Sequence, residues 1–206
     1  MSDLPLVSAI MPTRGRPLFA HEAVVLFQSQ TWPNKELVII DDEEAPSFPR
    51  CITGDGIRYE RLWGTLTVGA KRNIACSRAQ GEIIIHWDDD DFSAPERMSD
   101  QVNRLLSSDV ELTGYNEMLF TDGARWWFYG PKKDYVLGTS MCYRRSLWAR
   151  RPFEDRNIGE DLSFQMGVPK LAVPAGEIMW ARTHPNNTSP RVIRGPLWRE
   201  VEMQAA

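Results

Sequence analysis

An apolar run that ends in four consecutive aspartates is the feature that most constrains the fold of this chain. The run Ile83–Trp87 follows Gly81 and leads directly into Asp88–Asp91. A run bounded by a glycine and by charges predicts a buried strand with the carboxylates at its carboxyl end, where open α/β sheets bind ligands. Adjacent carboxylates repel one another and stay ionised most readily beside a cation, and oxygen ligands favour Mg²⁺ or Mn²⁺. A solvated acidic loop is the alternative interpretation.

The first half of the chain alternates between strand-like and helix-like patterns. We expect strands over 4–11, 37–40, 57–63 and 83–87, and helices over 18–30, 68–79 and 95–106. This order predicts an α/β fold with a mostly parallel, Rossmann-like central sheet flanked by helices. The strand at 37–40 also ends in acids, Asp41–Glu44. Two acidic clusters are therefore expected at one edge of the sheet.

The second half of the chain has a different pattern. Strand-like segments over 111–120, 124–129 and 136–143 look antiparallel, which predicts a smaller antiparallel or mixed portion beside the parallel sheet. No boundary rich in Gly, Ser or Pro separates the halves, so we expect a single domain over residues 1–206. The tail from residue 190 is polar and basic, and we expect a mobile flap or a terminal helix there.

Composition and termini narrow the class of protein. The net charge of −4 argues against a nucleic-acid binder, although a local basic patch remains compatible with it. No run approaches the roughly 20 apolar residues of a membrane span, and the start lacks the features of a signal peptide. We therefore expect a cytoplasmic protein. Its cysteines, Cys51, Cys76 and Cys142, form no Cys-x-x-Cys pair, and we expect free thiols, with Cys76 and Cys142 in the core.

Candidate groups for a nucleotide lie after the first two strands. Asp42 can accept hydrogen bonds from a pyrimidine imide or a ribose hydroxyl, and the loop that contains Pro12, Thr13 and Arg14 offers backbone groups to the same moiety. The alternative for Asp41 and Asp42 is a turn that caps the next segment.

A helix that begins near residue 68 carries Lys71 and Arg72 in its first turn. Free amides and positive charge at a helix start suit a phosphate, whereas a solvated helix face is the competing interpretation. No Walker or dinucleotide glycine motif occurs in the chain, which argues against a P-loop enzyme and an NAD enzyme.

Two further candidates come late in the chain. Glu160 and Asp161 open a short amphipathic segment, where a carboxylate can take a proton from an acceptor hydroxyl or simply complement the helix dipole. His184 follows a strand-like segment over 177–181 and is a candidate third metal ligand, although a lone histidine is more often structural.

Taken together, these segments resemble the family 2 glycosyltransferases, which are inverting enzymes of the GT-A fold, from Val7 to about His184. Val7–Thr13 is similar to the first strand and nucleotide loop of that family. Ser29–Asp42 is similar to its stretch SQTYPNxELIVVDDGS, with Glu43 and Glu44 in place of the usual Gly-Ser.

The acidic segments extend the resemblance. Gly81–Asp91 resembles the segment that carries the DXD signature, to which Asp88 and Asp90 correspond, and Glu160–Asp161 resembles the later Glu-Asp pair. Each motif is weak to moderate alone, and their order and spacing carry the resemblance.

The resemblance implies in-line displacement at the anomeric carbon of a nucleotide sugar, most often a UDP sugar. It implies Asp161 as the catalytic base, and a nucleotide-binding half over about 1–108 followed by an acceptor and catalytic half over about 109–189. For the Mn²⁺ or Mg²⁺ ion, the resemblance implies Asp90 as a direct ligand and His184 as a further ligand. It places Asp88 and Asp89 near the metal or the ribose. Lys71 or Arg72 is implied at the diphosphate.

The acceptor is not indicated, and surface polysaccharide, lipid-linked sugar, protein and modified DNA stay open, as do the oligomeric state and a location peripheral to the membrane. The aromatic cluster Trp126–Tyr129 lies where such enzymes build the acceptor side. We expect core packing for at least two of the four rings, and a position of Trp127 or Tyr129 at the cleft is a further hypothesis.

Two rival functions remain. A sugar nucleotidyltransferase shares the sheet and the acids but needs a glycine-rich, basic loop after the first strand, which Arg14–Arg16 only partly supplies. The second is a non-catalytic module that binds a cation or a sugar. This function does not explain why Asp42, Arg72 and Asp161 occur together.

Overall fold

The computed structural model describes residues 4–44, 56–188 and 192–202. The strands are β1 Val7–Thr13, β2 Lys35–Asp41, β3 Ile57–Arg61, β4 Ile83–His86, β5 Phe92–Ser93, β6 Leu112–Thr121, β7 Trp126–Tyr129, β8 Cys142–Arg144, β9 Lys170–Pro174, β10 Met179–Arg182 and β11 Trp198–Val201. The helices are α1 Pro17–Gln28, α2 Val68–Arg78, α3 Arg97–Leu106, α4 Arg145–Arg150 and α5 Glu160–Gln165, with a 3-10 turn at Gly138–Ser140. No helix in these residues has both the length and the apolar character that crossing a membrane requires.

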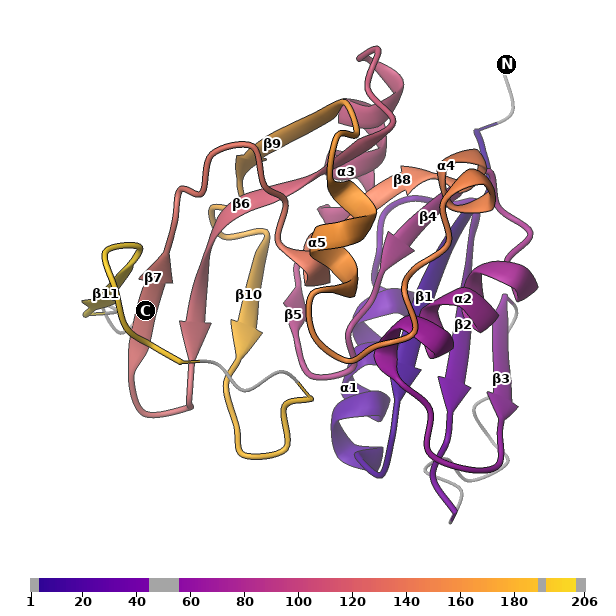
Figure 1. Cartoon of the computed structure of the whole chain (residues 1–206), viewed down its shortest axis with the longest axis horizontal. Helices are drawn as coiled ribbons and strands as arrows, with labels where there is room; N and C mark the ends of the chain where they lie inside the picture. Colours follow the sequence, from indigo (N-terminus) through magenta and orange to yellow (C-terminus); the bar gives the residue numbers. More distant parts are fainter. Residues whose placement is uncertain (1–3, 45–55, 189–191, 203–206) are drawn as a thin grey trace.

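The strands form one connected sheet whose main path runs β11-β7-β6-β8-β4-β1-β2-β3 (Figure 1). On the β1 side, β4, β1, β2 and β3 are parallel neighbours, as the sequence predicts. The register pairs Thr13 with Asp41 and Ile10 with His86. The carboxyl ends of β1, β2 and β4 therefore meet at one edge, and this edge brings the two acidic clusters together.

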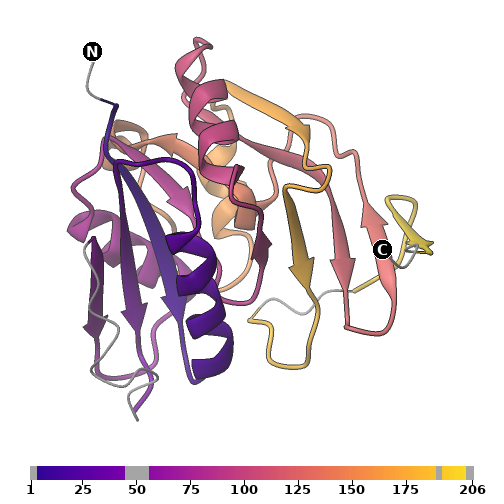
Figure 2. The same cartoon turned by 180° about the vertical axis from the view of Figure 1, so that it is seen from behind.

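Helices cover both faces of this sheet because apolar side chains alternate along β1. Val7, Ala9 and Met11 pack in one core with α1 and α3, and Ile10 packs in another with α2, α4 and α5. Figure 1 shows α2 and α5 on the near face, and the view from behind in Figure 2 shows α1 and α3 on the other. The α/β prediction is confirmed.

The second half is built around β6. It pairs antiparallel with β7 and β8, as expected, and parallel with β9 and β10. Of the expected strand over 136–143, only the end is β8, because Gly138–Ser140 forms the 3-10 turn instead. The strand β9 and the short helix α4 were not predicted, since neither segment has enough periodic residues to stand out.

The expected flap or terminal helix in the tail is wrong for residues 198–201. These residues form β11, which pairs antiparallel with β7. Trp198 anchors the strand, because its ring packs against Phe120 and Tyr129 with centroids 5.0 and 4.7 Å apart. One aromatic side chain in a polar segment thus outweighs the composition around it.

The described cysteines behave as expected. Cys76 and Cys142 are free thiols buried in the core, and burial raises the pKa of each thiol to about 12. Both are therefore protonated and inert structural residues at neutral pH. Cys51 lies outside the described residues.

Candidate active site

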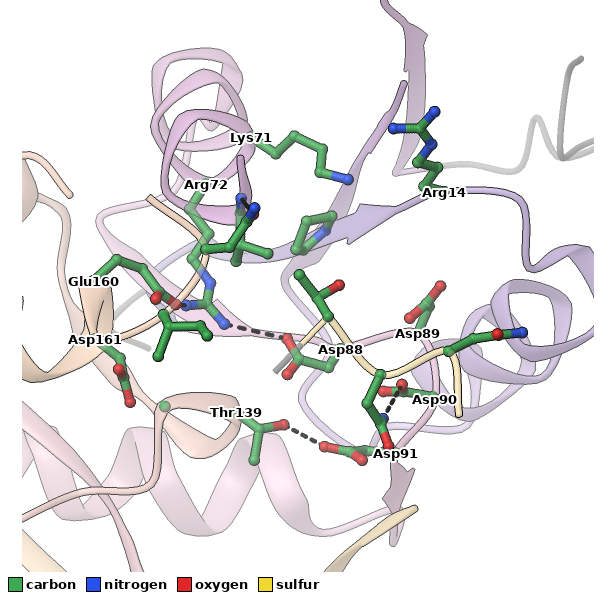
Figure 3. A pocket seen from close by; sticks show the side chains of 18 of the residues that line it. Arg14, Lys71, Arg72, Asp88, Asp89, Asp90, Asp91, Thr139, Glu160 and Asp161 are labelled. Atoms are coloured by element: carbon green, nitrogen blue, oxygen red, sulfur yellow. Dashed lines mark hydrogen bonds and ion pairs between the residues drawn. The ribbon is translucent and has the colours of Figure 1, made fainter. Parts of the chain in front are cut away.

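A cavity of about 300 Å³ opens at the edge where β1, β2 and β4 end (Figure 3). Its walls come from the loop after β1, the start of α2, the aspartates after β4, the 3-10 turn, the start of α5 and the segment after β10. Most of the predicted site residues line it: Pro12, Arg14, Lys71, Arg72, Asp88, Asp89, Asp90 and Asp161. The other three, Thr13, Asp42 and His184, do not line it but bond to residues that do.

Asp42 is fully buried, and both of its oxygens are engaged. Lys71 Nζ donates to Oδ1 at 2.8 Å, and the backbone N–H of Leu66 donates to Oδ2 at 2.7 Å. Lys71 Nζ also donates to the Thr13 carbonyl at 3.1 Å. In this arrangement Asp42 fixes Lys71 and the chain before α2, and a contact of Asp42 with a base or a ribose stays a prediction.

Asp89 and Asp90 are bridged by Arg16, which precedes α1. Arg16 Nη2 lies 2.6 Å from Asp89 Oδ1, and Nη1 donates to Asp90 Oδ2 at 2.7 Å. Thr13 Oγ1 donates to the other oxygen of Asp89 at 2.6 Å. Burial, with the charges of Asp90 and Asp88 adding to it, raises the pKa of Asp89 to about 7 although Arg16 opposes the shift. The contacts of the Arg16 side chain with the aspartates were not predicted, because these partners are more than 70 positions away.

His184 contacts Asp90 as a hydrogen-bond donor. The backbone N–H of Asn186 donates to His184 Nδ1 at 3.2 Å, which places the ring proton on Nε2. That Nε2–H reaches Asp90 Oδ2 at 3.0 Å, and Asn187 Nδ2 donates to the same oxygen at 3.1 Å. Phe19 of α1 stacks on the imidazole with centroids 4.9 Å apart. Ligation of a metal through Nε2 would need the other tautomer.

Arg72 joins the aspartates after β4 to the acids of α5. Its buried guanidinium lies between Asp88 and Glu160 in Figure 3, 3.5 Å from Asp88 Oδ1 and hydrogen-bonded to Glu160. Burial alone would raise the pKa of Asp88, but Arg72 outweighs it and lowers that pKa. Burial raises the pKa of Glu160 against the same cation. Arg72 is thus the shared counter-charge of both acidic groups.

Asp161 is held against the 3-10 turn. Tyr135 donates its hydroxyl to Asp161 Oδ2 at 2.8 Å. The Gly138 carbonyl accepts a 2.6 Å hydrogen bond from His86 Nδ1, and burial keeps the imidazole neutral by lowering the pKa of His86 well below its usual value. A Cβ at Gly138 would lie 2.5 Å from Asp161 Oδ2, so a larger residue at this position would push the Asp161 side chain aside. Neither Tyr135 nor Gly138 was identified from the sequence.

Gly138→Ala is expected to push the Asp161 carboxylate out of place and lower turnover by about tenfold to a hundredfold, since a shift of about 1 Å costs that much. Donor affinity, measured by calorimetry, should change little. In an Asp161→Asn background the same change should add almost nothing, because both variants act through one carboxylate. Additive losses would contradict this coupling.

Asp91 connects elements and is not an open ligand. Thr139 donates its hydroxyl to Asp91 Oδ2, and the backbone N–H of Arg182 donates to Oδ1 at 3.2 Å. Arg97 of α3 adds a second connection by donating to the carbonyls of His86 and Thr139 at 2.7 and 3.0 Å. These bonds fix the end of β4 relative to the 3-10 turn and β10.

The oxygen donors present fit a hard divalent ion that is completed by a substrate. Within the described ranges no three His, Cys, Asp or Glu side chains are placed to hold a metal by themselves. Asp88 Oδ1, however, is buried and receives no hydrogen bond from a described residue. Mg²⁺ sites are commonly built from one or two carboxylates plus substrate phosphates, which Asp88 and Asp90 match.

The expectation that Trp127 or Tyr129 faces the cleft is wrong, since neither ring lines the cavity. Trp127 is buried, with Arg125 over its ring at 4.9 Å. Tyr129 packs against Phe120 and Trp198 with centroids 6.1 and 4.7 Å apart. Tyr129 thus packs between β6, β7 and β11, which pairs along the edge of β7.

Residues 8–172 match the family model described as glycosyl transferase family 2. The chain is 34% identical over 166 residues to a putative colanic acid biosynthesis glycosyl transferase, WcaA, of Escherichia coli, across 77% of this chain and 56% of that protein. It is 30% identical over 119 residues to an uncharacterized glycosyltransferase of Haemophilus influenzae, across 55% of this chain and 48% of that protein. The chain thus spans about half the length of these curated relatives.

Solved structures share the fold at low identity. S. aureus TarS 1-349 in complex with UDP-GlcNAc superposes with a TM-score of 0.70 at 18% identity, across 91% of this chain and 61% of that one. The mannosyltransferase PcManGT from Pyrobaculum calidifontis, in complex with GDP-Man and Mn²⁺, gives 0.67 at 16% identity, across 91% and 59%.

Proposed function

Because this chain belongs to glycosyl transferase family 2, we propose that it transfers a sugar from a nucleotide sugar to an acceptor hydroxyl. One observation carries the proposal. The aspartates after β4 and the Glu160–Asp161 pair of α5, far apart in the sequence, share one cavity and one buried counter-cation, Arg72. A cavity that holds acids, cations and a helix start suits a diphosphate beside a reacting hydroxyl.

In the proposed reaction the acceptor hydroxyl loses its proton to Asp161 and its oxygen attacks the anomeric carbon. The bond from that carbon to the diphosphate oxygen breaks, the nucleoside diphosphate leaves with the electron pair, and the configuration inverts. Asp161 suits this role because it lines the cavity while Tyr135 and Gly138 hold its carboxylate in one orientation.

The leaving diphosphate needs positive charge. Lys71 and Arg72 lie near the start of α2 and line the same cavity, so the helix start and both cations would lie beside the departing group. A Mn²⁺ or Mg²⁺ ion held by Asp90 and Asp88 would supply further charge to the diphosphate. The similar structures of TarS in complex with UDP-GlcNAc and of PcManGT in complex with GDP-Man and Mn²⁺ support such a donor. We propose a UDP sugar.

A sugar nucleotidyltransferase is the second candidate, and the loop after β1 disfavours it. Binding a triphosphate needs a glycine-rich, basic loop, and this loop supplies a single glycine and two arginines, of which Arg16 lies against Asp89 and Asp90. Pyrophosphate release from a nucleoside triphosphate and a sugar phosphate would favour this candidate.

Thermal unfolding with a panel of nucleotide sugars, with and without Mn²⁺, tests the donor. A ligand at about 100 times its Kd should stabilise the protein by about 2.7 kcal/mol. We expect the largest rise in Tm with a UDP sugar and Mn²⁺ together, and a smaller one with the sugar or the ion alone. Equal shifts with an unrelated nucleotide such as NAD would contradict a sugar-nucleotide site.

Tyr135→Phe is expected to lower kcat by about tenfold. The variant loses the hydrogen bond that orients the Asp161 carboxylate, and a hydrogen bond to a charged group is worth about 1.5 kcal/mol or more. KM for the donor should stay within about twofold, since Tyr135 does not line the cavity. Steady-state kinetics of nucleoside diphosphate release measure both constants. A rise in KM at constant kcat would show that Tyr135 acts on binding instead.

A further inference from the structure

Arg16 places a positive charge between two neighbouring aspartates of the site. Its guanidinium spans Asp89 and Asp90 at 2.6 and 2.7 Å, and the three side chains are 15%, 1% and 9% exposed. Two neighbouring carboxylates with so little solvent require a counter-ion, and in this arrangement the chain itself supplies it. The guanidinium makes one contact to each carboxylate: a hydrogen bond to Asp90 and a close ion pair with Asp89.

The same contact competes with a divalent ion for Oδ2 of Asp90. Asp90 Oδ2 accepts from Arg16, His184 and Asn187 together, so this oxygen has no lone pair left for a metal. A metal ion on this carboxylate would also lie close to the guanidinium, and two cations on one carboxylate repel each other.

The Arg16 side chain can move away from Asp89 and Asp90 without disrupting α1, the helix that it precedes. Its backbone carbonyl accepts from the Ala20 N–H at 3.0 Å, and its side chain makes no capping bond to α1. The side chain also lines the cavity of about 300 Å³, so a displaced guanidinium has space beside the aspartates.

We propose that Arg16 is an internal counter-cation that a divalent metal must displace in order to bind Oδ2 of Asp90. Arg16 then sets the metal affinity of the site and neutralises Asp89 and Asp90 whenever no metal is bound. This inference rests on the proposed metal site at Asp90 and goes beyond it, because it assigns a competing role to a residue outside the ligand set.

Competition has two linked consequences. Removal of Arg16 should tighten metal binding, because the apparent affinity of the wild-type chain is reduced by the fraction of molecules in which Arg16 occupies Asp90. It should also destabilise the metal-free protein, because Asp89 and Asp90 lose the cation that contacts both of them. Mn²⁺ should reverse that destabilisation by mass action.

The test is Mn²⁺ binding to the full chain without nucleotide, with free Mn²⁺ followed by electron paramagnetic resonance. We expect Arg16→Gln to bind Mn²⁺ about tenfold more tightly than the wild type. Arg16→Lys, which keeps the charge but loses the fork, should fall between the two and serves if the Gln variant does not fold. Arg104→Gln is the matched control outside the cavity, since Arg104 pairs with Asp100 on α3 instead, and its Mn²⁺ affinity should equal that of the wild type.

Thermal unfolding of the same proteins gives a second readout. In EDTA, Arg16→Gln should have a lower Tm than the wild type, and saturating Mn²⁺ should raise its Tm by more than it raises that of the wild type. An equal or weaker Mn²⁺ affinity in both Arg16 variants would overturn the proposal.

Asp90→Asn separates this proposal from the proposed function. If Asp90→Asn abolishes Mn²⁺ binding but the Arg16 variants bind like the wild type, the role of Arg16 is wrong and the metal site stands. If Asp90→Asn leaves Mn²⁺ binding unchanged, the metal is not at Asp90 and both assignments fail. Binding that appears only after Arg16 is replaced would support the proposal most strongly.

Discussion

Asp161→Asn is expected to lower sugar transfer by about a thousandfold, because general-base catalysis contributes about 10²–10⁴-fold and asparagine cannot take the proton. The amide oxygen can still accept the hydrogen bond that Tyr135 donates at 2.8 Å. Fold and donor affinity should therefore persist, and the loss should fall on kcat. Nucleoside diphosphate release under donor saturation measures it.

The matched control for this variant is Asp122→Asn. Asp122 lies in the turn between β6 and β7, where its side chain accepts from the backbone N–H groups of Ala124 and Arg125 at 3.0 and 2.8 Å. An amide oxygen can accept both bonds, so turnover should equal that of the wild type. Near-normal turnover of Asp161→Asn, with the substitution verified by mass spectrometry after the assay, would remove Asp161 as the base.

Arg72→Gln is expected to destabilise the protein by about 3–5 kcal/mol, the usual cost of breaking a buried ion pair from one side. Asp88 and Glu160 would both lose the cation that lies between them. Turnover should fall as well, because the variant removes positive charge from the diphosphate side of the cavity. Urea unfolding at pH 7 measures the change in the free energy of unfolding.

Arg78→Gln is the matched control on the same helix. Arg78 also pairs with a glutamate, Glu60, at 2.7 Å, but the pair is exposed to solvent, so no measurable change in stability is expected. Glu160→Gln combined with Arg72→Gln should recover part of the lost stability, because one uncompensated carboxylate is removed. An Arg72→Gln protein as stable as Arg78→Gln would show that the buried bridge contributes nothing.

The parallel half of the fold follows from the sequence because its signals are local. Leu37–Ile40 and Ile83–Trp87 are apolar runs that stop at acids, and parallel pairing alone brings the ends of such strands to one edge. The expected ends of β2 and β4 therefore agree with the structure to within two residues, and the acidic edge of the site could be predicted.

The remaining site contacts depend on residues that only tertiary structure brings together. Arg16 meets Asp90 across 74 positions, and Tyr135 meets Asp161 across 26, so no spacing in the sequence marks either pair. Gly138 looks like an ordinary turn glycine until the carboxylate beside it is placed. The tail was misjudged for a related reason, since β11 exists because Trp198 finds a distant aromatic partner in Phe120.

Product analysis tests the proposed sugar transfer most directly. The full chain is incubated with nucleotide sugars and Mn²⁺, and in parallel with nucleoside triphosphates and sugar 1-phosphates, and the released phosphates are separated by ion-exchange chromatography. A glycosyltransferase releases a nucleoside diphosphate from the nucleotide sugar, and Asp161→Asn suppresses that release. Pyrophosphate from the triphosphate reactions, with no nucleoside diphosphate from any nucleotide sugar, would contradict the proposed sugar transfer.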